Sequence, residues 1–155
     1  MKLHQHMRKP FLALAAAIAA AVAPTHGAVA QEVVSIRGEK VNMRAAPSSR
    51  AEVRWQLGSG YPLRVVGSKG SWLQVVDFEN DKGWVARHLT SRTPHAIVKS
   101  PTAHIRSGPG TRYKVLGKAS YGEVFQVTQR RAGWVRVKVG DSGAGWIARS
   151  LLWGR

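Results

Sequence analysis

The chain has no cysteine among its 155 residues, and its acidic residues are few: 8 Asp and Glu stand against 24 Lys and Arg. The first absence excludes a disulfide, thiol chemistry and a lipid anchor attached to cysteine. The second leaves a strongly basic protein, which favours contact with an anionic partner. The longest apolar run covers 13 residues, 11–23, whereas a membrane-spanning helix needs about 20.

The first thirty residues have the pattern of an export signal. A basic start at residues 2–9 precedes the apolar run, and Ala28-Val29-Ala30 supplies the small-x-small pattern of a cleavage site. We therefore predict a signal peptide over 1–30, cleavage after Ala30, and a periplasmic or secreted protein with no membrane span after cleavage. Cleavage would remove three of the 24 basic residues and no acidic one, so the mature chain would carry a net charge of +13.

The mature chain is an internal repeat. Residues 83–87 read GWVAR and residues 145–149 read GWIAR, 62 positions later, and the same offset gives 13 identities over residues 41–90 without a gap. We therefore predict two domains, 31–92 and 93–155. Each is so small that it would be marginally stable alone, so we expect the two to support each other across an interface.

Each repeat is predicted to be all-β. The segments are short, rich in Val, Trp and Ile, and interrupted by Gly, Pro or Ser every eight to twelve residues. No stretch of the mature chain keeps the apolar spacing of an amphipathic helix. This pattern is typical of a small sandwich or barrel.

The order of motifs resembles a known family. The first copy has Asn42-x-Arg44-x-x-Pro47, the second has IRSGPG at 105–110, and each then has the Gly-Trp motif described above. This order resembles that of the bacterial SH3-type (Src-homology-3-like) domain, although His104 replaces the usual Asn in the second copy. The resemblance implies two small SH3-like β-barrels in tandem after the signal helix, in an exported, non-catalytic module that attaches to the cell wall or to a protein.

One strand of the second repeat is the main candidate for ligand binding. Residues 134–139, WVRVKV, alternate, so three valines face the core while Trp134, Arg136 and Lys138 share the other face. An aromatic plate beside two cations suits a sugar or peptide plane that carries a carboxylate. The alternative is that this tryptophan and its equivalent Trp72 only cover the core.

Further candidates are weaker. Trp84 and Trp146 are assigned mostly to the core, whereas Arg87 and Arg149 are placed on the opposite face as a possible surface patch. Arg44 and Arg106 are expected to tie loop carbonyls. Residues that break the repeat symmetry are candidate exposed contacts: Tyr113, Tyr121, Trp55 and Trp153.

The sequence contains no motif for catalysis, for a metal site or for cofactor binding. The histidines of the mature chain, His88, His95 and His104, do not have zinc-ligand spacing. Glu79 and Asp81 flank an Asn in a polar turn, where solvated carboxylates are the simpler interpretation. We therefore predict a protein that is not an enzyme, with no metal and no cofactor.

The leading hypothesis is a binding module for peptidoglycan, its stem peptide, or another anionic component of the cell envelope. The alternative is an adaptor that binds an envelope protein through a strand edge or an aromatic face. Nucleic acid is disfavoured as a partner because export removes the protein from it. The sequence does not predict an oligomeric state.

Overall fold

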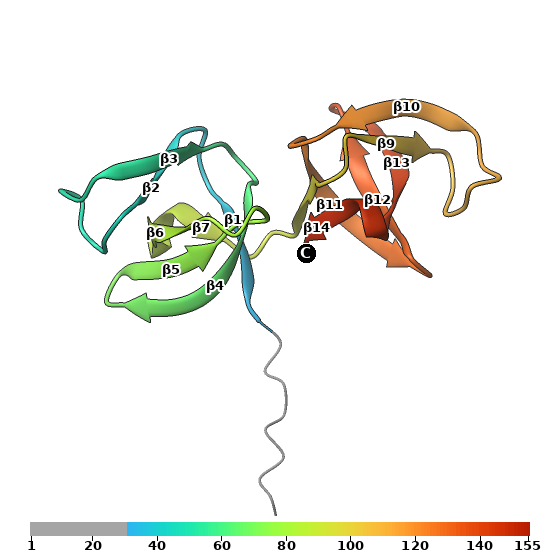
Figure 1. Cartoon of the computed structure of the whole chain (residues 1–155). Helices are drawn as coiled ribbons and strands as arrows, with labels where there is room; N and C mark the ends of the chain where they lie inside the picture. The colour runs from blue at the N-terminus through green and yellow to red at the C-terminus, as the bar shows by residue number, and fades with distance from the viewer. Residues whose placement is uncertain (1–30) are drawn as a thin grey trace, which may run out of the picture.

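The computed structural model describes residues 31–155, so the predicted signal helix and the cleavage site at Ala30 lie outside the described residues. Fourteen strands and two single turns of 3₁₀ helix make up the described part of the chain, which contains no α-helix (Figure 1). The all-β prediction is confirmed. No helix among residues 31–155 combines the length and the apolar character that a membrane crossing requires.

The first half of the chain forms one antiparallel sheet. Its strands follow the order β3-β2-β6-β5-β4-β1-β7 across the sheet. A 3₁₀ turn, η1 (Arg87–Leu89), joins β6 to β7. The strands are β1 (Val33–Ile36), β2 (Val41–Arg44), β3 (Val53–Leu57), β4 (Pro62–Lys69), β5 (Trp72–Val76), β6 (Lys82–Ala86) and β7 (Thr90–Ser91).

The second half forms a second sheet with the same order, β10-β9-β13-β12-β11-β8-β14. Every element begins within one residue of the position 62 places after its counterpart, and η2 (Arg149–Leu151) repeats η1. The strands are β8 (His95–Val98), β9 (Thr102–Arg106), β10 (Val115–Ser120), β11 (Val124–Arg131), β12 (Trp134–Val139), β13 (Gly143–Ala148) and β14 (Leu152–Gly154).

The prediction of closed barrels is wrong. Within residues 31–155, β3 and β7 are the unpaired edges of one sheet, and β10 and β14 are the edges of the other. Strand β7 has only two residues and pairs with β1, while β3 pairs with β2, so no ladder joins the two edges and closes the sheet. Within the sheet, β2 pairs with β6 only through Arg44 and Trp84, just as β9 pairs with β13 only through Arg106 and Trp146.

A separate hydrophobic core lies inside each sheet. The strands alternate as the sequence predicts: in β12, Val135 and Val137 are buried while Arg136 and Lys138 are exposed. Leu63, Val75 and Val85 are completely buried in the first core. Val98, Val137 and Ile147 are completely buried in the second.

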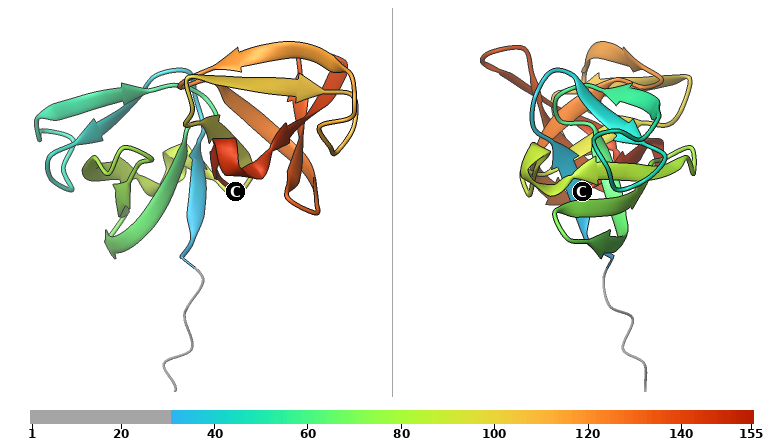
Figure 2. Two further views of the ribbon diagram at one scale, coloured as in Figure 1. Left: turned by 45° about the vertical axis from the view of Figure 1, so that its right-hand side comes forward. Right: turned by 90° about the vertical axis from the view of Figure 1, so that its left-hand side faces the viewer.

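The two sheets contact each other directly. Strand β4 packs against β8 and β14, where Pro62 lies so close to Gly154 that an added Cβ there would come within 3.1 Å of its ring. On another loop, the ring of Phe78 lies 5.4 Å from that of Tyr121, whose hydroxyl donates a hydrogen bond to Glu79. The expected interface is therefore confirmed, and Figure 2 shows the two lobes from two further sides.

Candidate functional site

The predicted face of β12 is present in the structure. Arg136 and Lys138 are exposed and Trp134 is half-buried, while the alternating valines turn inward. On the neighbouring strand β11, Arg131 stands opposite Trp134. Three exposed cations, Arg131, Arg136 and Lys138, therefore share the outer face of these two strands with Trp134.

The same face holds a second tryptophan. Trp146 pairs with Arg136 in the register of β12 and β13, so both side chains lie on the same side of the sheet. Trp146 is nonetheless buried, at 8 % exposed, so its assignment to the core is confirmed. Its neighbour Gly145 takes the core-facing position because Ile105 fills the space that a larger side chain would need.

The first domain lacks this arrangement. Trp72 is half-buried on β5, its neighbour two positions on is the uncharged Gln74, and Val76 is buried. Trp84 is half-buried opposite Gln74, on the outer face like Trp146. The two domains thus present different surfaces at equivalent positions, as the sequence predicts.

The predicted hydrogen bonds from Arg44 and Arg106 to loop carbonyl groups are confirmed. Arg44 donates to the carbonyl oxygen of Ala51 at 2.7 Å. Arg106 donates from one nitrogen to the carbonyl oxygens of Thr111 and Tyr113, at 2.9 and 3.0 Å. Each guanidinium closes the loop that follows the second strand of its repeat.

The tyrosine candidates have different environments. Tyr113 is 37 % exposed, and its ring packs on Gly108 and lies 5.6 Å from the guanidinium carbon of Arg112. Tyr121 is 49 % exposed, but its hydroxyl is held by Glu79 across the domain interface. The structure therefore leaves Tyr113 available as a contact and uses Tyr121 to join the domains.

The paired arginines after the Gly-Trp motifs lie apart from the β12 face. Arg87 is exposed and approaches the carbonyl oxygen of Gly70 at 3.5 Å. Arg149 lines a cavity of about 770 Å³ between the domains. Sequence reasoning missed this cavity, because it is formed by residues from both halves of the chain.

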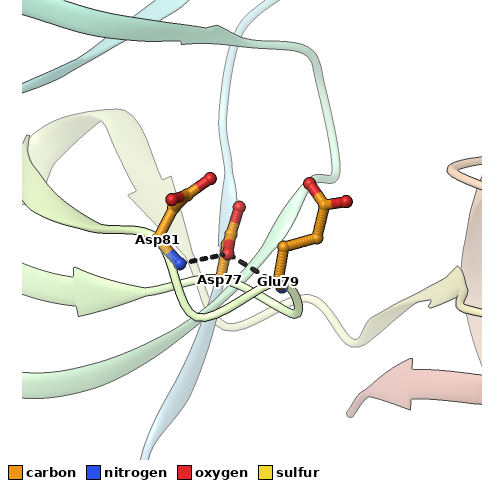
Figure 3. A group of neighbouring side chains, drawn as sticks. All are labelled: Asp77, Glu79 and Asp81. Carbon is orange, nitrogen blue, oxygen red and sulfur yellow. Dashed lines mark hydrogen bonds between the residues drawn. The ribbon is translucent and has the colours of Figure 1, made fainter.

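Three carboxylates form a cluster in the β5–β6 loop. Asp77, Glu79 and Asp81 place their oxygen atoms within 4.8 Å of one another (Figure 3). Asp77 is buried, and its Oδ1 accepts the backbone N–H groups of Glu79 and Asp81, both at 2.9 Å. Its Oδ2 accepts the hydroxyl of Tyr61 at 3.1 Å. Carboxylate oxygens are ligands for a hard cation, but here both oxygens of Asp77 are already used to shape the turn.

This environment changes the acidity of Tyr61. Burial, followed by the negative charge of Asp77 and the hydrogen bond to it, raises the pKa of Tyr61 well above its ordinary value. The hydrogen bond to Glu79 raises the pKa of Tyr121 as well. Both phenols are therefore held in the protonated, donating form.

The fold and its repeated topology define a pair of small antiparallel-sheet domains. Residues 37–92 and residues 101–152 each match a family model described as a bacterial SH3 domain. The chain thus contains two bacterial SH3 domains in tandem, and the resemblance inferred from the motifs is confirmed.

One curated relative matches nearly the whole chain. It is the putative N-acetylmuramoyl-L-alanine amidase YrvJ of Bacillus subtilis strain 168, 27 % identical over 161 residues. The match covers 94 % of this chain and 31 % of that protein. The chain therefore spans about a third of the length of the curated relative.

Solved structures give weaker matches. An NlpC/P60 family protein from Bacillus cereus ATCC 10987 has a TM-score of 0.38 and 16 % identity, over 80 % of this chain and 56 % of that one. The structure titled Endolysin LysPBC5 CBD has a TM-score of 0.34 and 18 % identity, over 80 % and 93 %. These scores are too low to carry a functional inference.

The curated relative overturns one expectation. The sequence predicted a protein that is not an enzyme, because no catalytic motif was found in it. The relative carries the name of an amidase, so sequences of this kind occur within a protein named as a hydrolase. The prediction is corrected for that reason: a search for motifs within two bacterial SH3 domains is no guide to the activity of a protein that contains them.

Proposed function

We propose that the two domains act at the cell wall and bind peptidoglycan, outside the cytoplasm, in the service of wall hydrolysis. Two bacterial SH3 domains and a relative named as an N-acetylmuramoyl-L-alanine amidase support this role. Export through a signal peptide ending at Ala30, and domain limits of 31–92 and 93–155, are part of the proposal.

The observation that carries the proposal is the outer face of β12. The half-buried Trp134 offers an apolar plate, and the exposed Arg136 and Lys138 follow it at two-residue steps. Sugar rings and peptide planes stack on such plates, while carboxylates pair with the adjacent cations. Peptidoglycan presents both kinds of group.

A protein partner is the second candidate, and one observation favours it. Trp55 is 52 % exposed on β3, an edge strand of the first sheet. Exposed edges can accept a further strand from another chain. Such binding would depend on apolar contact and would change little with salt, whereas the β12 face would weaken as exposed charges are screened.

Co-sedimentation of the full chain with purified sacculi tests the proposal. Trp134→Ala should weaken the affinity for sacculi by up to about tenfold, since stacking on one aromatic is worth about 0.5–1.5 kcal/mol beyond its area. Trp72→Ala, at the equivalent position of the first domain, is the matched control and should change it less than twofold. Equal losses in the two variants, or no binding by the unmodified chain at low salt, would refute the proposal.

A further inference from the structure

The cavity between the domains is lined by five cations. We call it the interdomain cleft; its volume is about 770 Å³. Figure 1 shows β14 and the C-terminal end of the chain between the two lobes, and residues of β14, Leu152 to Gly154, line the cleft. Four of the cations belong to the second domain and one to the first: Lys99, Arg130, Arg149, Arg155 and Arg64.

Positive charge is in excess in the cleft: four of its five cations are exposed, and Glu32 shares an adjoining cavity with only two of them, Arg130 and Arg155. None of the described side chains that line it is a carboxylate, and none of its five cations forms an ion pair within residues 31–155. The Nε atom of Arg64 is buried and has no hydrogen-bond partner in that part of the chain. Burial, with the nearby charges of Arg149 and Arg155, lowers the pKa of Arg130. Cations gathered in this way are stabilised by an anion between them.

The repeat supplies an internal comparison. A smaller cavity of about 290 Å³ lies at the equivalent place in the first domain, lined by Arg37 and Arg87, the counterparts of Lys99 and Arg149. There Glu32 also lines the cavity and its carboxylate lies 3.2 Å from Arg92. The first cavity is thus smaller and partly neutralised, although it has the same construction.

The additional features of the interdomain cleft come from outside the repeat. The first domain contributes Arg64. The second domain has Trp153 and Arg155 where the first has Ser91 and Thr93. Trp153 is half-buried and lines the cleft, so an apolar plate lies among the guanidinium groups. The contact between the domains adds Arg64 to residues that the second domain supplies by itself.

We propose that the interdomain cleft binds a carboxylate of a peptide, and that this carboxylate belongs to the stem peptide of peptidoglycan. The proposal rests on the proposed function for the source of the ligand. Guanidinium groups bind carboxylates through two parallel hydrogen bonds, and Trp153 would cover the adjoining peptide plane. The site is distinct from the β12 face and requires both domains.

The test is a titration of the full chain with soluble muropeptides, in which calorimetry measures the binding affinity. The double variant Arg130→Gln/Arg149→Gln should weaken binding at least tenfold, because each lost guanidinium removes a charge-assisted hydrogen bond. The matched control, Arg37→Gln/Arg50→Gln, removes the same charge from the first domain and should leave affinity within twofold. Muropeptides whose carboxylates are converted to amides should bind the unmodified chain weakly. Their affinity should match that of the double variant Arg130→Gln/Arg149→Gln for unmodified muropeptides.

The outcomes separate this proposal from the proposed function. If the full chain sediments with sacculi but both double variants lose the same affinity for muropeptides, the cleft is not the site and wall binding stands. If a phosphodiester polymer competes for the cleft more strongly than the muropeptides, the assignment to a carboxylate is overturned. If the unmodified chain binds neither sacculi nor muropeptides, both proposals fall. The single variant Lys99→Gln should also weaken binding while its circular dichroism spectrum stays unchanged. It keeps the proposal testable if the double variant does not fold.

Discussion

At the scale of single residues, Tyr61 is placed to make stability depend on alkaline pH. Its hydroxyl donates to the buried Asp77, and burial with that charge raises the pKa of Tyr61. In the unfolded chain the same phenol ionises near its ordinary pKa of about 10. Below that pH the stabilisation is fully present, and it is lost as the pH rises toward the folded value.

The unfolding free energy of the full chain should therefore fall between pH 10 and pH 11.5. Tyr61→Phe keeps the ring but cannot ionise, so its decline over that range should be shallower. Urea denaturation at a series of pH values measures both slopes. Parallel slopes in the two proteins would show that Tyr61 does not cause the effect.

The limits of sequence reasoning at this scale are clear from Trp134 and Trp146. Alternation along one strand correctly places Trp134 outward with Arg136 and Lys138. The direction of Trp146 depends on Gly145 and on the closeness of Ile105, a residue forty positions earlier. No pattern along the chain encodes that contact, so the sequence predicted the burial of Trp146 but not the side of the sheet on which it lies.

At the scale of elements, the two Gly-Trp strands differ in how much they tolerate a side chain. A Cβ on Gly145 would collide with Cγ2 of the β-branched Ile105, whereas a Cβ on Gly83 would lie 2.5 Å from Cγ of the unbranched Met43 and 3.1 Å from the carbonyl oxygen of Arg44. Met can shift to make room, and Ile has less freedom to do so. Strand β13 is therefore the more sensitive of the two.

Gly145→Ala should lower the unfolding free energy by about 2–3 kcal/mol, as overpacking of a well-filled core does. Gly83→Ala should cost less, about 1–2 kcal/mol, because Met43 can shift more easily than Ile105 and loss of glycine freedom in the unfolded chain offsets part of the strain. Urea unfolding followed by tryptophan fluorescence gives both values. A larger loss in Gly83→Ala would contradict this view of the two strands.

The repeat in the sequence correctly predicted matching strands in the two halves, but it did not predict that the sheets remain open. The strand order of one half is the strand order of the other, element by element. The sheets stay open because no ladder joins the edge strands β3 and β7, of which β7 has only two residues. Ladder length depends on the path of the backbone, which apolar spacing does not reveal.

At the scale of the whole molecule, the interdomain cleft is the feature that the sequence hides. Arg64 and Arg130 lie far apart in the chain, and their repeat equivalents are Gln126 and Ser68. Only the packing of β4 against β8 and β14 places them around one cavity. A repeat predicts what two domains share, whereas four residues of this cleft stand where the other domain has a residue of another kind: Arg64, Arg130, Trp153 and Arg155.

The six tryptophans of the chain report directly on which domain binds the wall. Indole N–H signals of the ¹⁵N-labelled full chain would be followed while soluble muropeptides are added. Binding by the second domain predicts shifts of the Trp134 and Trp153 signals, with Trp55 and Trp72 unchanged. Shifts confined to Trp55 and Trp72, or no shift at any concentration, would contradict it.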